Sequence, residues 1–349
     1  MKRILLFLFS IVLLNSCSNQ SGNKPLSTFY PTKISTAEPS QTPIQVPTLI
    51  PTIIPTPLGG SGEIAFISQS DNRGLIVIYQ LNSGMTMKPA IQTASEGEEE
   101  SPFGASSVFL SPDGLKIAFA YARCPVSTPS KKTIGHPTTW CRNEIYTANA
   151  DGSNVVELTH NSVDDYEPTW SPDGSRIAFV SKRTGDYEIY VMNIDGSDVK
   201  RITDNPKGWD FSPAWSPDSK KIAFASQRPG NFQIYVMNAD SSGGVVQLTK
   251  IKDISINPAW SPDGSKIAFS VYQIKSKQSD IYVMNSDGSN PTNITNGKYS
   301  PAGSPTWSPD GTMIAFVYES KLYRMNSDGS NVVKLVDADA DSSVSWSAH

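Results

Sequence analysis

Histidine and cysteine are scarce in this chain of 349 residues, which contains three of each. The histidines, His136, His160 and His349, are far apart and form no cluster of the kind that transition metals need. The Gly-x-Ser-x-Gly motif of the α/β-hydrolases is also missing. These absences leave little material for metal, thiol or nucleophilic catalysis. We therefore predict no catalytic residue, no metal ion and no cofactor.

Runs of basic residues and long apolar segments are missing as well. Charged residues make up 18% of the chain and the net charge is −4. Without a run of Lys and Arg to neutralise phosphates, the sequence predicts no nucleic-acid partner. The apolar stretch at residues 4–14 is too short to cross about 30 Å of hydrocarbon. Because Lys2 and Arg3 precede it, this stretch is typical of a signal peptide.

The end of this stretch reads Leu14-Asn15-Ser16-Cys17 and resembles the lipobox of bacterial lipoproteins. The resemblance implies that residues 1–16 are removed and that Cys17 becomes a lipidated N-terminus. The protein would then be extracytoplasmic and anchored to a bacterial membrane by lipid. The alternative is an ordinary secretory signal that contains a cysteine by chance.

Residues 17–60 carry prolines at a regular interval, at Pro39, Pro43, Pro47, Pro51 and Pro55. Proline fixes φ and removes a backbone donor, so neither a helix nor a sheet is expected here. Such a segment behaves as an extended spacer of about 3.1 Å per residue. We therefore expect a linker at 17–60 and a folded domain at 61–349.

The folded part repeats one motif. "WSPDGSRIAF" begins at Trp170, and close copies begin at Trp215 and Trp260, so the period is 45 residues. Repeats of about 40 to 50 residues indicate a propeller or a solenoid. One copy contains four short apolar segments, at residues 166–171, 176–181, 188–193 and 199–203, separated by turn residues. This pattern predicts four strands per unit.

The second and third segments of each copy are apolar on both faces. In one copy Ile177 and Phe179 alternate with Ala178 and Val180. A sheet with one face in water would alternate polar and apolar residues, so these sheets must be covered on both sides. Pro172, Asp173 and Gly174 supply the backbone angles of a tight turn between strands.

The number of copies predicts how the domain closes. "IAF" starts six times, at Ile64, Ile117, Ile177, Ile222, Ile267 and Ile314. The preceding strand also occurs six times, but its last copy, residues 342–347, has no "IAF" after it. The C-terminal strand is therefore expected to complete the blade begun near residue 63. The predicted fold is an all-β, six-bladed β-propeller of four-stranded antiparallel blades, and closure removes exposed sheet edges.

The repeated "WSPDG…IAF" and "IYVMNxDGS" motifs resemble the repeat of TolB-type β-propellers over about residues 62–349. The resemblance is specific for the fold but not for the function, because similar blades occur in scaffolds, peptidases and polysaccharide lyases. TolB itself carries an α/β domain before its propeller, and residues 18–60 are too short and too proline-rich for one. The partner of TolB is therefore not carried over.

Cys124 and Cys141 bracket an insertion between two strands that should pair antiparallel. An exported protein meets oxidising conditions, so we predict a disulfide between them. Two free thiols are the alternative.

One end of the ring should carry most of the candidate site residues, because the loops from second to third strands and from fourth to first strands meet there. We call this end the mouth. Aromatic rings beside polar groups on a rigid scaffold suit binding of a peptide or a sugar. The candidate ligand-binding residues are Asp165, Tyr166, Glu167, Trp209, Asp210, Phe211, Asn257, Tyr299 and Asp341. The alternative is that the rings pack between blades and the acids are solvated.

These features predict a monomeric, non-enzymatic envelope lipoprotein that binds a protein, a peptide or a cell-wall polysaccharide at the mouth. A glycan-acting enzyme, a lyase or a hydrolase, is the alternative and would use acids such as Asp165 and Glu167. A structural spacer without a ligand is a third possibility. A deep pocket lined by acids would favour the enzyme, and a shallow aromatic rim would favour the binding protein.

Overall fold

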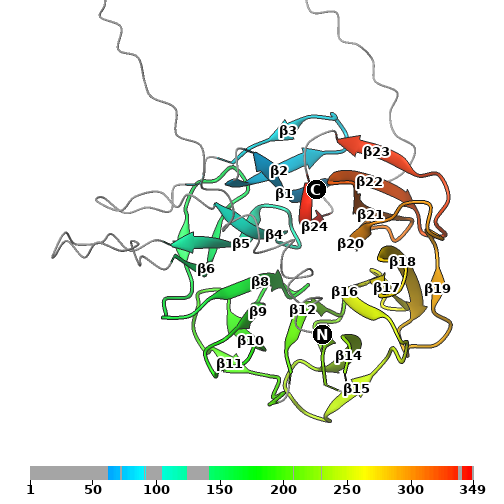
Figure 1. The fold of residues 1–349 in the computed structure, drawn as a ribbon. Coiled ribbons are helices and arrows are strands. Elements are labelled where there is room, and N and C mark those ends of the chain that lie inside the picture. The colour runs from blue at the N-terminus through cyan, green and yellow to red at the C-terminus, as the bar shows by residue number, and fades with distance from the viewer. Residues whose placement is uncertain are drawn as a thin grey trace, which may run out of the picture. The chain divides into compact units, whose positions relative to one another are not determined.

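Six four-stranded antiparallel sheets form a ring of blades in the computed structural model of the chain, so the predicted fold class is confirmed (Figure 1). The chain divides into two units, Met1–Thr56 and Pro57–His349. The structure describes residues 62–70, 73–89, 91, 104–123, 141–206, 208–228, 230–336 and 340–347. The predicted signal peptide, Cys17 and the spacer lie outside these residues. No helix in the described ranges is long and apolar enough to cross a membrane.

Each blade runs from an inner strand to a short outer strand. Blade 1 contains β24 (Ala340–Ser347), β1 (Glu63–Ser70), β2 (Arg73–Gln80) and β3 (Thr86–Met87). Blade 2 contains β4 (Ala105–Leu110), β5 (Lys116–Arg123), β6 (Arg142–Asn149) and β7 (Val156–Glu157). Blade 3 contains β8 (Asp165–Trp170), β9 (Arg176–Ser181), β10 (Glu188–Asn193) and β11 (Lys200–Arg201).

The remaining three blades follow the same order. Blade 4 contains β12 (Asp210–Trp215), β13 (Lys221–Ser226), β14 (Gln233–Asn238) and β15 (Val245–Gln247). Blade 5 contains β16 (Ile254–Trp260), β17 (Lys266–Gln273), β18 (Gln278–Asn285) and β19 (Thr292–Asn293). Blade 6 contains β20 (Ala302–Trp307), β21 (Met313–Tyr318), β22 (Lys321–Asn326) and β23 (Val333–Val336).

The Ser-Pro-Asp-Gly turn between the first two strands closes itself with hydrogen bonds. The Ser171 hydroxyl donates to Asp173 Oδ1 (2.6 Å) and accepts the Arg176 N–H (2.9 Å). Gly174 has φ of 71°, a conformation that glycine adopts without steric cost. Hydrogen bonds to its carboxylate, chiefly from the Ser171 hydroxyl and also from Ser175, lower the pKa of Asp173 to about 2. The repeated aspartates therefore serve the turns at the end of the ring opposite the mouth.

Both faces of a blade are buried because a neighbour covers each. Ile177 and Phe179 of β9 pack against blade 2, and Ala178 of the same strand packs against blade 4. The phenylalanine of each "IAF" copy is fully buried: Phe66, Phe119, Phe179, Phe224, Phe269 and Phe316. The strands are therefore apolar on both faces because each sheet packs between two neighbouring sheets, as the sequence predicted.

The tryptophan of the repeat joins neighbouring blades. Its indole N–H donates to a backbone carbonyl in the inner strand of the preceding blade. The bonds run from Trp170 to Phe109 (3.3 Å), Trp215 to Thr169 (3.2 Å), Trp260 to Ala214 (3.2 Å) and Trp307 to Ala259 (3.1 Å). Blade 2 has Leu110 in place of this tryptophan. The Leu110 backbone N–H donates to Ser345 Oγ of β24 in blade 1 (3.1 Å).

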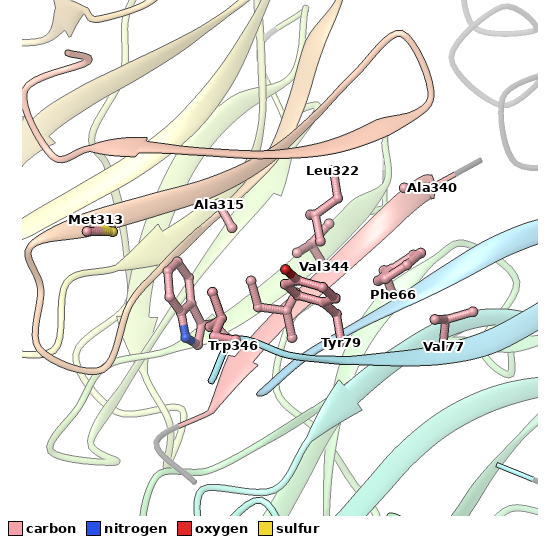
Figure 2. Close-up of a cluster of buried hydrophobic side chains, with 11 residues drawn as sticks. Phe66, Val77, Tyr79, Met313, Ala315, Leu322, Ala340, Val344 and Trp346 are labelled. Atoms are coloured by element: carbon pink, nitrogen blue, oxygen red, sulfur yellow. The ribbon is translucent and has the colours of Figure 1, made fainter. Parts of the chain in front are cut away.

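The C-terminal strand closes the ring as predicted. β24 pairs antiparallel with β1, with Ile64 opposite Trp346 and Phe66 opposite Val344. Figure 2 shows the apolar cluster at this joint, in which blade 1 residues pack against Met313, Ala315 and Leu322 of blade 6. Two ends of the described chain thus form one sheet.

The register near the cysteines agrees with the predicted disulfide. Arg123 and Arg142, which adjoin Cys124 and Cys141, are partners in the β5–β6 pair. Cys141 is disulfide-bonded. Cys124 lies outside the described residues, so the bridge between the two stays a prediction.

Candidate functional site

Backbone hydrogen bonds join the two sets of mouth loops. The Gln227 N–H, after β13, donates to the Trp209 carbonyl before β12 (3.0 Å). The Asp210 N–H donates to the Tyr187 carbonyl before β10 (2.9 Å). Loops from neighbouring blades therefore meet at one end of the ring, where the sequence placed the candidate site.

Two of the candidate acids lie beneath the mouth. The Asp165 and Asp210 side chains are fully buried, and each forms a salt bridge at 2.9 Å, with Arg183 and Arg228 respectively. Burial raises the pKa of both carboxyls, although the paired guanidinium acts in the opposite direction. In these positions the two acids are paired with the arginines of the adjoining mouth loops.

A second pair of buried acids was not singled out from the sequence. Glu144 and Glu188 precede the "IY" of β6 and β10, and both are about 2% exposed. Thr203 Oγ1 donates to Glu188 Oε2 (2.6 Å), and Thr159 Oγ1 donates to Glu144 Oε2 in the same way (2.7 Å). Burial raises the pKa of Glu144 to about 7. The repeated "EIY" of the sequence was the signal that could have identified them.

Asn161 links these acids at the joint of blades 2 and 3. Its side-chain amide donates to Asp165 Oδ2 (2.7 Å) and to Glu144 Oε2 (3.3 Å). Asn205 bridges Glu188 and Asp210 at the next joint, where its backbone N–H donates to Glu188 and its side-chain amide donates to Asp210. All these carboxylates have partners within the fold, so the arrangement stabilises the joints under the mouth.

Glu167 and Asn257 belong to a different group, on the inner strands. The inner-strand residues Glu167, Ser212, Asn257 and Ser304 share a left-handed conformation with φ of 51° to 53°. The Ser212 N–H donates to Glu167 Oε2 (2.6 Å), and Ser212 Oγ donates to Asn257 Oδ1 (2.9 Å). Side chains of three blades thus join around the axis of the ring. Burial raises the pKa of Glu167 to about 7, although the Ser212 N–H lowers it.

The candidate residues Tyr166, Trp209 and Phe211 meet in one cluster with two rings that were not predicted, Tyr187 and Phe232. We call these five residues the aromatic patch. Tyr187 lies at its centre, with ring centroids 4.9 Å from Phe211, 5.9 Å from Trp209 and 6.4 Å from Tyr166. Phe211 also contacts Phe232 at 6.0 Å. Trp209 and Phe211 are half-buried, whereas the other three are buried. The patch is therefore anchored in the fold and reaches solvent through two rings.

Tyr299 lies in a separate cluster on blade 6. Its ring is 5.6 Å from Tyr318 and 6.4 Å from Tyr323, and all three rings are half-buried. Asp341 lies within β24 rather than in the preceding loop, and only its backbone is described. The structure thus brings together Tyr166, Trp209 and Phe211, joins Glu167 to Asn257 through Ser212, and leaves Tyr299 apart. The ligand-binding role of these residues stays a prediction.

The described surface has two hollows near blade 4. One, of about 320 Å³, is lined by Asn231, Gln233, Gln247, Lys250, Ile251 and Lys252 at the mouth of blade 4. The other, of about 490 Å³, lies between blades 3 and 4 and is lined by residues such as Arg176 and Arg201. Within the described ranges, no group of three or more His, Cys, Asp or Glu residues could hold a metal ion.

The chain matches the family model of the TolB beta propeller domain over residues 45–207 and 242–349. A curated relative, dipeptidyl-peptidase 5 of Porphyromonas gingivalis, is 36% identical over 84 residues, which are 24% of this chain and 11% of that protein. The uncharacterized peptidase YuxL of Bacillus subtilis is 33% identical over 98 residues, 28% of this chain and 13% of that protein. The chain therefore spans a small part of these two relatives.

Among solved structures, TolB from Acinetobacter baumannii superposes with a TM-score of 0.62 at 22% identity. The alignment covers 82% of this chain and 67% of that one. At this identity the likeness concerns the fold.

Proposed function

We propose that this chain, which belongs to the TolB beta propeller domain family, binds a protein or peptide of the cell envelope at its mouth and catalyses no reaction. The aromatic patch carries this proposal. Trp209 and Phe211 present half-buried rings to solvent, and Tyr187 and Phe232 hold them from below. Rigid aromatic rings on a fixed scaffold contribute much contact area at little entropic cost, which suits recognition of a partner.

The disposition of the acids supports binding over glycan chemistry. A glycosidase needs two carboxyl groups on either side of a substrate bond. Asp165 is fully buried in its salt bridge, and Glu167 accepts the Ser212 N–H on the inner strand of the blade. In the described part of the chain the single histidine is His160, whose ring bonds the Glu157 carboxylate. None of these groups forms a pair poised for catalysis.

The peptidase names of two relatives do not extend to this chain in our proposal. The shared segments amount to 84 and 98 residues, or roughly two blades of the propeller. A match of this length indicates that the blades are alike. It does not carry the peptidase activity over, because one fold can serve many activities.

The location forms part of the proposal. The signal-like residues 4–14 and the lipobox-like Cys17 favour an extracytoplasmic protein tethered by lipid, with residues 18–60 as a spacer. Mass spectrometry of the mature N-terminus tests this directly. A diacylated Cys17 supports the anchor, and an unmodified chain cut elsewhere contradicts it.

Capture from the envelope fraction of the producing cell tests the binding function. The immobilised full chain is compared with Trp209→Ala and with Leu115→Ala, an exposed residue of a turn at the opposite end of the ring. We expect Trp209→Ala to lose the captured partner while the melting temperature falls little, and Leu115→Ala to keep it. Equal capture by both variants would refute a role for the aromatic patch.

A further inference from the structure

Five lysines occupy three consecutive loops of the mouth. The loops are residues 248–253 between β15 and β16, 274–277 between β17 and β18, and 294–301 between β19 and β20. We call them the lysine loops. Their lysines are Lys250, Lys252, Lys275, Lys277 and Lys298, and all five are exposed.

Two aspartates hold the lysine loops beside one another. Asp253 Oδ1 of the first loop accepts the Ile274 N–H of the second loop (3.1 Å). The buried Asp280 accepts the Gln273 side-chain amide at the start of the second loop (2.9 Å) and the Gly297 N–H of the third loop (2.7 Å). The lysines therefore project from a prearranged surface rather than from independent flexible loops.

The lysines of these loops carry their charge at the surface. None of the five has a carboxylate within salt-bridge distance in the part of the chain that the structure describes. By contrast, Arg183 and Arg228 of the neighbouring mouth loops are paired with buried aspartates. Asp253 and Asp280 accept backbone and amide N–H groups, which are neutral, so the two carboxylates offset only part of the charge of the five lysines. Because exposed like charges repel one another, an anionic partner would relieve a cost that the free protein bears.

The first lysine loop borders the hollow of about 320 Å³, and Lys250 and Lys252 contribute to its wall. The Asn231 and Gln233 amides support this wall by donating to the Lys252 and Ile251 carbonyls (2.8 and 3.0 Å). The hollow is polar throughout except for Ile251.

Aromatic rings lie on both sides of the lysine loops. On one side the buried Phe232 precedes β14, whose first residue Gln233 lines the hollow, and it contacts the half-buried Phe211 ring that reaches solvent. At the other side the Lys298 ammonium lies 5.3 Å from the ring centroid of Tyr299. A chain that alternates acidic and apolar side chains could use both surfaces, whereas a phosphate polymer or a lipid headgroup offers nothing to the rings.

We propose that the lysine loops recognise an acidic peptide segment, one that carries several Asp or Glu residues among apolar ones. This inference rests on the proposed binding function and names its ligand class. The carboxylates would pair with the five lysines, and the apolar side chains would contact the neighbouring rings. Pairing across an exposed surface chiefly supplies specificity and faster association, and salt weakens it.

Fluorescence anisotropy with defined probes tests the inference on the full chain in detergent micelles. The probes are a short labelled peptide in which Glu alternates with Leu, and its isostere in which Gln replaces every Glu. We expect the Glu peptide to bind about tenfold more tightly than the Gln peptide, with a preference that shrinks as salt is raised. Equal affinity for the two peptides would overturn the inference.

A matched pair of double variants locates the effect. Lys250→Gln with Lys252→Gln should weaken binding of the Glu peptide about tenfold and leave the Gln peptide unaffected. Lys220→Gln with Lys221→Gln removes two exposed lysines near the opposite end and should change affinity less than about twofold. An equal loss in both double variants would overturn the inference. Binding of phosphatidylglycerol vesicles without binding of the Glu peptide would also overturn it, in favour of a lipid headgroup.

The two proposals fail in different ways. If the peptides bind equally while Trp209→Ala still abolishes capture from the envelope fraction, the mouth binds a partner and the charge preference is wrong. If Trp209→Ala leaves capture unchanged while the lysine variants weaken it, the aromatic patch is not the contact surface and the lysine loops are.

Discussion

Ile64 and Trp346 face each other as register partners in β1 and β24, although they belong to the first and last strands of the described chain. This pair joins the ends of the propeller into one sheet, and the apolar cluster of Figure 2 seals the joint against blade 6. A closed ring fixes the strands from which the described mouth loops emerge, so the stability of this joint supports what is proposed for the mouth.

Deletion of residues 342–349 should open the ring. The deletion removes Val344 and Trp346 from the cluster, and burying two such side chains contributes several kcal/mol, at about 1.5–3 kcal/mol each. Urea unfolding should show a midpoint well below that of the full chain. Deletion of His349 alone is the control, and equal midpoints for the two deletions would contradict closure by β24.

Trp307→Phe should lower the free energy of unfolding by about 1 kcal/mol, because the Ala259 carbonyl loses its indole donor while the ring volume is largely kept. Trp260→Phe breaks the same bond one joint earlier, so its loss should be similar. Denaturant unfolding of both variants measures this. No loss in either would mean that the indole N–H does not join the blades.

Arg228→Ala should destabilise the protein by about 3–5 kcal/mol at neutral pH, because it leaves the fully buried Asp210 without its cation. Thermal unfolding of this variant is compared with that of Lys182→Ala, which removes an exposed charge from a neighbouring mouth loop. A change within about 0.5 kcal/mol for both variants would show that the Arg228–Asp210 pair does not stabilise the fold.

Stability should rise as the pH falls from about 8 to about 5.5. The pKa of Glu144 is raised from 4.5 to about 7 in the folded state, chiefly by burial, so the folded protein binds more protons than the unfolded chain in this range. The turn aspartates act in the opposite sense at lower pH, because the pKa of Asp173 is lowered from 3.8 to about 2. The stability they contribute is present above about pH 4 and is lost below it.

Melting temperatures across this pH range test the effect, with Glu144→Gln as the variant. The substitution keeps the size of the side chain and removes the titrating group, so the rise towards mild acid should become smaller. A rise of the same size in the variant would assign the effect to other groups.

The fold could be predicted because its causes recur in the sequence. The spacing of Trp170, Trp215 and Trp260, the turn residues after them and the two-faced apolar strands each reflect a local requirement of a blade. Closure followed from the unmatched strand at residues 342–347, which the structure extends to Ala340.

The site was less predictable because burial depends on neighbouring blades. Asp165 and Asp210 looked like mouth residues, and the arginines that pair with them lie on loops 18 residues later in each blade. Trp209 and Phe211 could be singled out as candidates because aromatic residues near the mouth loops are a visible signal. The lysine loops were not recognised as one surface, because the bonds of Asp253 and Asp280 that align them appear only in three dimensions.

Hydrogen–deuterium exchange of the full chain, with and without its captured envelope partner, tests the central claim that the propeller binds through its mouth. The account predicts slower exchange in the mouth segments that contain Trp209, Lys250 and Lys275, and unchanged exchange in the Ser-Pro-Asp-Gly turns at the opposite end. Protection confined to those turns, with none in the mouth segments, would contradict it.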